Sequence, residues 1–203
     1  MVEQLSFLST DGGSIPTSSL QSMRVKECMF EDISHIFRDY HYKRDNMGGG
    51  IMLCLSLVWN CTIIGGVVVG KLRHDAAYST DKRKCIELRR MACIDDAPKN
   101  TESYFLSKVI WFLRKHTDID EVISYSDLSV GHVGTIYKAA NFKLLGETAP
   151  SKHVFWKGKR YHPRSLTIDR AYSYQLREAL KNGEATVEIG KPKLIYSYKI
   201  VRG

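Results

Sequence analysis

The segment from residue 51 to residue 70 constrains the fold most, because it is largely apolar and nearly long enough to cross a membrane as a helix. Two polar residues and a pair of glycines interrupt it: Asn60, Thr62, Gly65 and Gly66. Apolar and β-branched residues fill both halves, which favours a hairpin of two buried strands, 51–59 and 62–71. We therefore expect no membrane-spanning helix and a core built on β-structure.

The order of the remaining predicted elements indicates an α+β fold with a mixed sheet. The expected strands are 24–30, 85–94, 121–126 and a closing pair, 142–146 and 153–156. The expected helices are 31–40, one capped by Asn100 or Thr101, and 134–140. Apolar residues at helical spacing, such as Phe105, Val109 and Leu113, support these helices. The last part adds a helix over 168–180 and a strand over 194–201.

Thirty lysines and arginines against 22 aspartates and glutamates give the 203-residue chain a net charge of +8. This balance favours an anionic partner, namely nucleic acid, a phosphorylated cofactor or a membrane surface, and leaves a merely basic surface as the alternative. The five cysteines form no CxxC pair and lie among apolar residues, which predicts reduced thiols in a cytosol. No basic flank precedes an apolar stretch near residue 1, so we expect no secretory signal and a cytoplasmic protein.

Three groups that can transfer protons follow one predicted strand. The strand runs into Asp127, a glycine-containing turn carries His132, and the next helix carries Tyr137. Open α/β sheets place their sites in the crevice at such strand ends. Asp127 there can accept a hydrogen bond from an amine or act as a base, and Tyr137 can donate to a developing anion. The structural alternative makes Asp127 a capping residue and Tyr137 a core aromatic residue.

Three further polar segments are candidates for binding. His41, at the end of a predicted helix, is either a ligand or base, or a ring stabilised by the helix dipole. Arg90 lies on the strand 85–94, where an inward-facing arginine needs a partner or a ligand. A helix start carries a lysine and polar residues that attract phosphate or simply cap the helix: Lys99, Asn100, Thr101 and Ser103.

A basic segment interleaved with aromatic residues follows the closing pair of strands. Its members are Lys157, Lys159, Arg160, Tyr161, His162 and Arg164. The cations suit a phosphate backbone, and the rings suit stacked bases. A solvated basic loop has a similar composition, so the segment alone does not establish DNA binding.

The most specific motif is Gly131–Phe142 followed by Gly146-Glu147-Thr148. It stands with four other stretches: His41-Tyr42, Glu87–Arg90, Ser124–Asp127 and Arg160–Leu166. Together they resemble the Mom family of bacteriophage DNA-modification proteins, which belong to the GNAT (N-acetyltransferase) superfamily. The resemblance spans about residues 30–166, and the first 22 residues and the tail after about 167 carry little of it. It implies a GNAT-like mixed β-sheet flanked by helices.

The resemblance also implies an activity, the conversion of adenine in double-stranded DNA to N6-carbamoylmethyl (methylcarbamoyl) adenine, which shields phage DNA from restriction. Because N6 lies inside the base stack, such an enzyme flips the base or catches it unpaired. Asp127 then holds the exocyclic amine, and Tyr137 transfers a proton. The other assignments are His41 and Tyr42 to the opposite wall, Arg90, Ser103, Lys99, Asn100 and Thr101 to the donor, and Lys157–Arg164 to DNA. A metal, iron or zinc, with His41 and Asp127 as ligands, is also implied.

One segment departs from the superfamily, whose members present a glycine-rich loop to the pyrophosphate of acetyl-CoA. Here that place reads Asp95-Asp96-Ala97-Pro98-Lys99-Asn100, with two acids, no glycine and a proline that has no N–H to donate. The sequence therefore disfavours acetyl-CoA and leaves an acyl or aminoacyl donor of another kind open.

We expect three parts along the chain. Residues 1–22 form a poorly ordered lead-in, 23–166 the GNAT-like catalytic domain, and 167–203 a C-terminal helix–strand extension packed on the same domain. Two other functions remain open: a conventional N-acetyltransferase for a protein or small amine, and a DNA-binding protein without catalysis.

Overall fold

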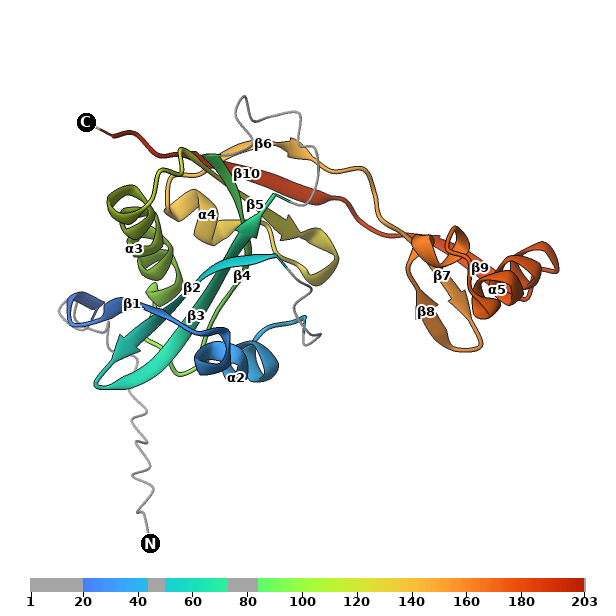
Figure 1. Cartoon of the computed structure of the whole chain (residues 1–203), viewed down its shortest axis with the longest axis horizontal. Coiled ribbons are helices and arrows are strands. Elements are labelled where there is room, and N and C mark those ends of the chain that lie inside the picture. The colour runs from blue at the N-terminus through green and yellow to red at the C-terminus, as the bar shows by residue number, and fades with distance from the viewer. Residues whose placement is uncertain (1–19, 44–49, 73–83, 203) are drawn as a thin grey trace, which may run out of the picture.

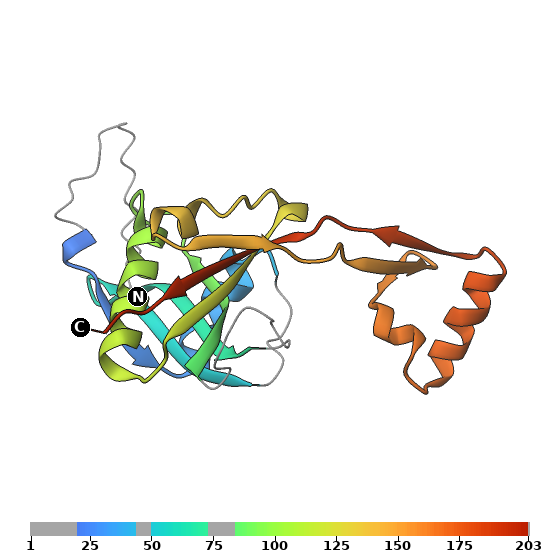
Figure 2. The same cartoon turned by 90° about the horizontal axis from the view of Figure 1, so that it is seen from above.

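The computed structural model describes residues 20–43, 50–72 and 84–202 (Figure 1). They form a main body with a seven-stranded sheet and a small lobe, residues 152–189, with a three-stranded sheet. Two extended segments join the two parts, and the small lobe stands clear of the main body in both views (Figures 1 and 2). The lead-in expected over residues 1–22 lies outside the described residues as far as residue 19.

The main sheet confirms the predicted α+β class. Its strands are β1 (Arg24–Cys28), β2 (Ile51–Trp59), β3 (Thr62–Lys71), β4 (Cys85–Cys93), β5 (Glu121–Asp127), β6 (Lys143–Glu147) and β10 (Lys193–Lys199). They lie in the order β1-β2-β3-β4-β5-β10-β6, with β4 and β5 parallel and the other neighbours antiparallel. The predicted hairpin is present residue for residue as β2 and β3.

Helices cover both faces of the main sheet: α2 (Phe30–Tyr40), α3 (Thr101–His116) and the short α4 (Thr135–Ala139). The apolar stripe of α2 packs on one face against residues such as Val68, while α3 packs on the other against Val67 and Val69. Neighbouring residues of a strand point to opposite faces, so this run of valines serves two cores. No helix in residues 20–43, 50–72 and 84–202 is long and apolar enough to cross a membrane.

The small lobe contains β7 (Lys152–Trp156), β8 (Lys159–Tyr161), a 3-10 turn (Pro163–Leu166), α5 (Ala171–Lys181) and β9 (Ala185–Ile189). Its strands have the order β8-β7-β9. They share a core with α5, in which Val154, Leu176, Ala179 and Ala185 are buried. The small lobe therefore has a hydrophobic centre of its own.

The predicted closing pair of strands is wrong, because β6 pairs with β10 in the main sheet and β7 pairs with β8 and β9. Pro150 lies between β6 and β7, and Pro192 lies opposite it between β9 and β10. Proline has no N–H for a strand ladder, so pairing stops on both strands at this point. Strand pairing also crosses the predicted boundary at 166 and 167, since β10 returns to the main sheet.

The predicted start of α3 is confirmed, because Asn100 is its N-cap residue. However, Asn100 has a left-handed φ of 69° and its side chain makes no capping hydrogen bond. The hydroxyl of Thr101 points backward and donates to the Pro98 carbonyl at 2.6 Å. The start of α3 is therefore held by a turn through Pro98 rather than by a side-chain cap.

Candidate active site

A cavity of about 590 Å³ lies where β4 and β5 separate. The two strands pair only from Cys85 and Glu121 to Leu88 and Ser124. Beyond that point their edges diverge, and both line the cavity. The lining also includes the end of α2 and the loop from Gly131 to α4. The predicted residues in this lining are His41, Tyr42, Arg90 and Tyr137.

One wall of the cavity consists of three rings. His41 stacks on Tyr42 with ring centres 4.6 Å apart, and Tyr42 meets His132 edge to face at 5.1 Å. The first two rings follow α2, and the third comes from the turn after β5. Tyr42 and His132 are exposed, so this wall presents accessible aromatic rings in two orientations.

Burial lowers the pKa of His41 to about 4, with Arg90, His132 and Lys43 adding positive charge nearby. The ring is therefore neutral near pH 7. Its Nδ1 lies 3.0 Å from the backbone N and 3.2 Å from the carbonyl oxygen of Lys43, so either neutral tautomer has a partner there. His41 at neutral pH is thus an uncharged ring and not a cation.

Stability should fall as the pH decreases through the titration range of His41. The unfolded chain takes up a proton near the ordinary pKa of 6.5, whereas the folded protein resists protonation until about 4. The expected contribution is a loss of at most about 3 kcal/mol in the free energy of unfolding between these pH values. Urea denaturation of wild type and His41→Gln at several pH values measures it, since the carboxylates titrate alike in both. Parallel curves for the two proteins would contradict the assignment.

Tyr137 forms the floor of the cavity. Its ring is buried against Tyr196, with centres 5.1 Å apart, and its hydroxyl accepts a hydrogen bond from Ser124 Oγ at 2.7 Å. Burial raises the pKa of Tyr137, against an opposing effect of the Ser124 hydrogen bond. The phenol is therefore protonated at neutral pH and can donate a proton but does not act as a base.

Tyr196 of β10 holds this floor in place, although the sequence motif ends far before it. The Tyr196 side chain is fully buried, and its hydroxyl donates to the Val133 carbonyl at 3.1 Å. Gly134 has a φ of 75°, and a Cβ there would lie 2.3 Å from the Tyr196 ring. The glycine is required at this position because of both its backbone conformation and the ring beside it.

Arg90 joins the aromatic wall to β4. The side chain is buried at 8% exposure, and its Nη1 donates to the Lys43 carbonyl at 3.1 Å. It shares the cavity lining with three carboxylates, Asp39, Asp95 and Glu102. The predicted inward position of Arg90 is therefore observed, together with acidic groups that the sequence did not place at this site.

Asp127 lies at the end of β5 but is not among the residues that line the cavity. Its carboxylate accepts hydrogen bonds from Ser129 N at 3.0 Å and Ser129 Oγ at 2.5 Å, and lies 3.7 Å from Lys193 Nζ. Burial alone would raise its pKa, but these partners lower the pKa below its usual value. Asp127 therefore fixes the turn that leads to His132.

The predicted donor residues at the start of α3 do not line the cavity: Lys99, Asn100, Thr101 and Ser103. Ser103 Oγ donates to the Asn100 carbonyl at 3.1 Å, within its own helix. The backbone N–H groups of Ala97 and Thr101 donate to Ile94 and Pro98. The turn itself thus uses two N–H groups of this loop, and Pro98 has none to donate.

The predicted DNA-binding residues lie together on the small lobe, on β8 and beside it. Lys157 Nζ lies 4.6 Å from the centre of the Trp156 ring, and Lys159 Nζ lies 5.9 Å from that of Tyr161. Tyr161 also faces the ring of Tyr172 at 6.4 Å. The interleaving seen in the sequence is therefore an array of cations over aromatic rings.

The predicted metal site lacks a complete set of ligands. In the described part of the chain, no group of three or more His, Cys, Asp or Glu side chains is placed to hold a metal ion. His41 lines the cavity, whereas the carboxylate of Asp127 is held by Ser129 and Lys193. We therefore assign no residue to a metal and derive no step through one.

Comparison with known proteins gives one family. The model of the Mom protein family matches residues 22–199. A curated relative, "Methylcarbamoylase mom" of Escherichia phage Mu, is 37% identical over 86 residues. That match covers 41% of this chain and 34% of the relative, so the chain matches about a third of the length of that protein.

Solved structures of N-acetyltransferases have the same fold. The ribosomal-protein-S18-alanine N-acetyltransferase of Escherichia coli has a TM-score of 0.52 at 11% identity, over 89% of this chain and 96% of that one. A Bacillus subtilis acetyltransferase in complex with CoA has a TM-score of 0.53 at 10% identity, over 88% and 98%. An aminoglycoside acetyltransferase in complex with coenzyme A has a TM-score of 0.54 at 9% identity, over 88% and 95%. The predicted GNAT-like fold is confirmed.

Proposed function

The chain belongs to the Mom protein family, and we propose that it is a transferase that converts adenine in double-stranded DNA to N6-carbamoylmethyl adenine. The observation that carries the proposal is the cavity between β4 and β5, whose walls combine stacked rings with a buried, protonated tyrosine. Its volume lies within the range of roughly 300–1,000 Å³ that small-molecule sites have. Such a modification would protect phage DNA from restriction nucleases.

The adenine is proposed to enter the cavity flipped out of the duplex, at a cost of roughly a few kcal/mol. The exposed ring of Tyr42 supplies an aromatic contact for the base, and neutral His41 supplies an uncharged ring nitrogen as a hydrogen-bond partner. When N6 bonds to the donor carbonyl carbon, the bond from that carbon to the donor's leaving oxygen or sulfur breaks. Tyr137 on the floor gives its proton to that leaving atom, and the proton lost by N6 passes to solvent. With a glycyl donor the group on N6 is then an isomer of carbamoylmethyl, so it has to rearrange to give the final product. Asp127 positions the His132 turn, and its direct contact with the exocyclic amine remains a prediction.

The donor is proposed to be acyl or aminoacyl, bound between the diverging strands with Arg90 on one side. Asp95 and Glu102 line the same cavity and would repel a pyrophosphate, and Pro98 in the loop before α3 has no N–H to donate to one. CoA is bound by the N-acetyltransferase of Bacillus subtilis that shares this fold. The residues of this chain fit an acyl carrier of lower negative charge better than acetyl-CoA.

Acetyl-CoA is therefore expected to stabilise the protein little or not at all. A ligand present at 100 times its dissociation constant would add about 2.7 kcal/mol to the free energy of unfolding. Thermal denaturation with millimolar acetyl-CoA, with CoA and without ligand should give the same melting temperature. A clear rise with acetyl-CoA that disappears in Arg90→Ala or Ser103→Ala would restore acetyl-CoA as the donor.

The proposed function is tested by mass spectrometry of nucleosides from cells that express the protein. Carbamoylmethyl adenine should appear in their DNA and be absent from cells expressing Tyr137→Phe. Unmodified DNA together with an acetylated protein or small amine would support a conventional N-acetyltransferase. Unmodified DNA together with tight binding to DNA would support a binding protein without catalysis.

A further inference from the structure

The strands β7 and β8 form a basic hairpin, here called the β7–β8 ribbon, at one edge of the three-stranded sheet of the small lobe, in which β9 pairs along the other side of β7. They pair through Val154–Tyr161, Phe155–Arg160 and Trp156–Lys159. The turn between them, Lys157-Gly158, has positive φ angles of 49° and 70°, so the ribbon is tight and has a lysine at its tip. Residues 152–162 contain four lysines and arginines, two histidines and no acid.

The two faces of this ribbon differ. Val154, Trp156 and Tyr161 pack on the core beneath α5, which leaves Phe155 and Arg160 side by side on the opposite face. Arg160 is exposed and Phe155 half-buried. Lys157 and Lys159 lie over Trp156 and Tyr161, so the rings hold the two ammonium groups near the tip of the ribbon, beside the open face rather than on it.

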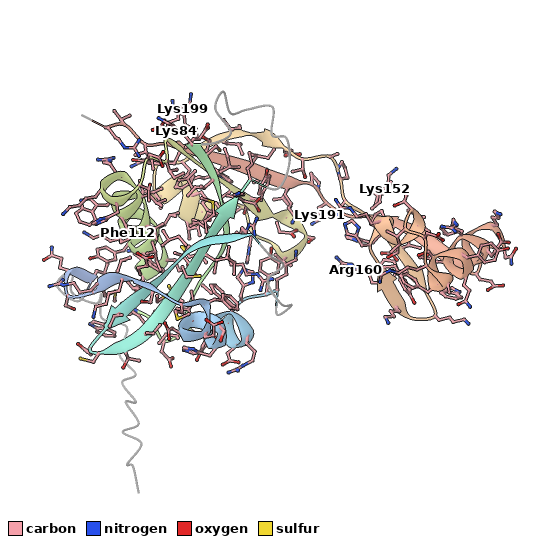
Figure 3. All side chains as sticks on the ribbon, viewed as in Figure 1. Lys84, Phe112, Lys152, Arg160, Lys191 and Lys199 are labelled. Atoms are coloured by element: carbon pink, nitrogen blue, oxygen red, sulfur yellow. The ribbon has the colours of Figure 1, made fainter. Side chains whose placement is uncertain are left out.

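The open face is directed toward the active site. In Figure 1 the ribbon lies on the side of the small lobe nearer the main body, and α5 lies farther away in both views. Figure 3 shows Arg160 on that same side. The loop after β5, which carries the mouth of the cavity, lies on the side of the main body that faces the lobe (Figures 1 and 2).

We propose that the open face of the small-lobe sheet, with the β7–β8 ribbon at its edge, lies in the major groove of duplex DNA and that Arg160 reads a guanine in the duplex that flanks the target adenine. Strands of β-sheets read the grooves of DNA in several protein families, and arginine donates two hydrogen bonds to guanine O6 and N7. Phe155 next to it offers an apolar surface for a thymine methyl group. Lys157 and Lys159 contact the phosphates. This rests on the proposed function, to which it adds the means by which a sequence context is selected.

The test measures base preference separately from overall affinity. Duplexes with randomised base pairs around a fixed adenine are bound to the protein, and the bound fraction is sequenced. Wild type should enrich guanine at one position, and Arg160→Lys should lose that enrichment by about 5- to 150-fold, because lysine keeps the charge but not the paired donors. Lys157→Ala should weaken binding to all duplexes and keep the base preference. It should also reduce, by about one, the slope of the logarithm of the binding constant against the logarithm of the salt concentration.

Lys181→Ala is the matched control, since it removes a positive charge from α5 on the far side of the lobe, where Lys181 pairs with Glu178. It should change neither preference nor salt dependence. The proposal is overturned if wild type shows no base preference, or if Arg160→Lys keeps the preference of wild type. Failure of the proposed function can be told apart from failure of this proposal. It appears as unmodified adenine in the nucleoside assay, independently of the base preference measured for Arg160.

Discussion

Tyr137→Phe is expected to lower the rate of DNA modification by about 10²- to 10⁴-fold, the usual contribution of a general acid. The phenol is the buried proton donor on the cavity floor, and phenylalanine keeps the ring but removes the proton. The fold should survive, because Ser124 Oγ has a second acceptor in the Leu88 carbonyl at 3.3 Å. Nucleoside mass spectrometry measures the loss, and the melting temperature shows that the protein is folded.

Tyr196→Phe provides the matched control for this prediction. The Tyr196 hydroxyl also belongs to a buried ring, which stacks on the ring of Tyr137. It donates to the Val133 carbonyl, however, and Tyr196 does not line the cavity. It should cost about 1 kcal/mol of stability and little activity. Equal losses of activity in the two variants would show that Tyr137 acts through packing and not through its proton.

Gly134→Ala is expected to destabilise the protein by about 2–4 kcal/mol. The new Cβ would adopt a φ of 75° and lie 2.3 Å from the Tyr196 ring, which is fully buried and cannot move without opening the core. Urea denaturation measures the change. Activity should fall with it, because Gly134 begins the helix that carries Tyr137.

Gly131→Ala separates the two causes of this effect. Gly131 has a similar φ of 80°, but no atom lies within 4 Å of a Cβ built there. Its expected cost is only the left-handed backbone, about 1 kcal/mol. Equal destabilisation by Gly134→Ala and Gly131→Ala would mean that the Tyr196 ring can move to accommodate the added methyl group.

Elements whose residues carry local signals could be predicted from the sequence. Runs of apolar and β-branched residues predicted β2 and β3 with the bounds that the structure shows, and helical spacing predicted α2 within one residue. The same local signals brought His41, Arg90 and Tyr137 together as candidates, because each ends or adjoins a predicted element of the catalytic region. Family resemblance supplied what spacing could not, namely that these separate segments meet.

Pairing between distant strands could not be predicted from local signals. The pattern of Lys193–Lys199 indicates a strand but not that it lies between β5 and β6. Tyr196 was missed for this reason, although the alternation of apolar and polar residues around it marks a half-buried strand. Asp127 was predicted to contact substrate from its place at a strand end, whereas its carboxylate is taken up by Ser129 and Lys193.

The position of β10 between β5 and β6 also sets an order on events during protein synthesis. Both neighbours of β10 leave the ribosome before it, and the whole small lobe, with its own core, is made in between. Until residues 193–199 emerge, the turn at Gly134 lacks its packing contact with Tyr196, and the edge of β5 that pairs with β10 has no partner strand from β10. The nascent chain can therefore complete the small lobe before the cavity region of the main body, which is complete only after β10 has paired with β5 and β6.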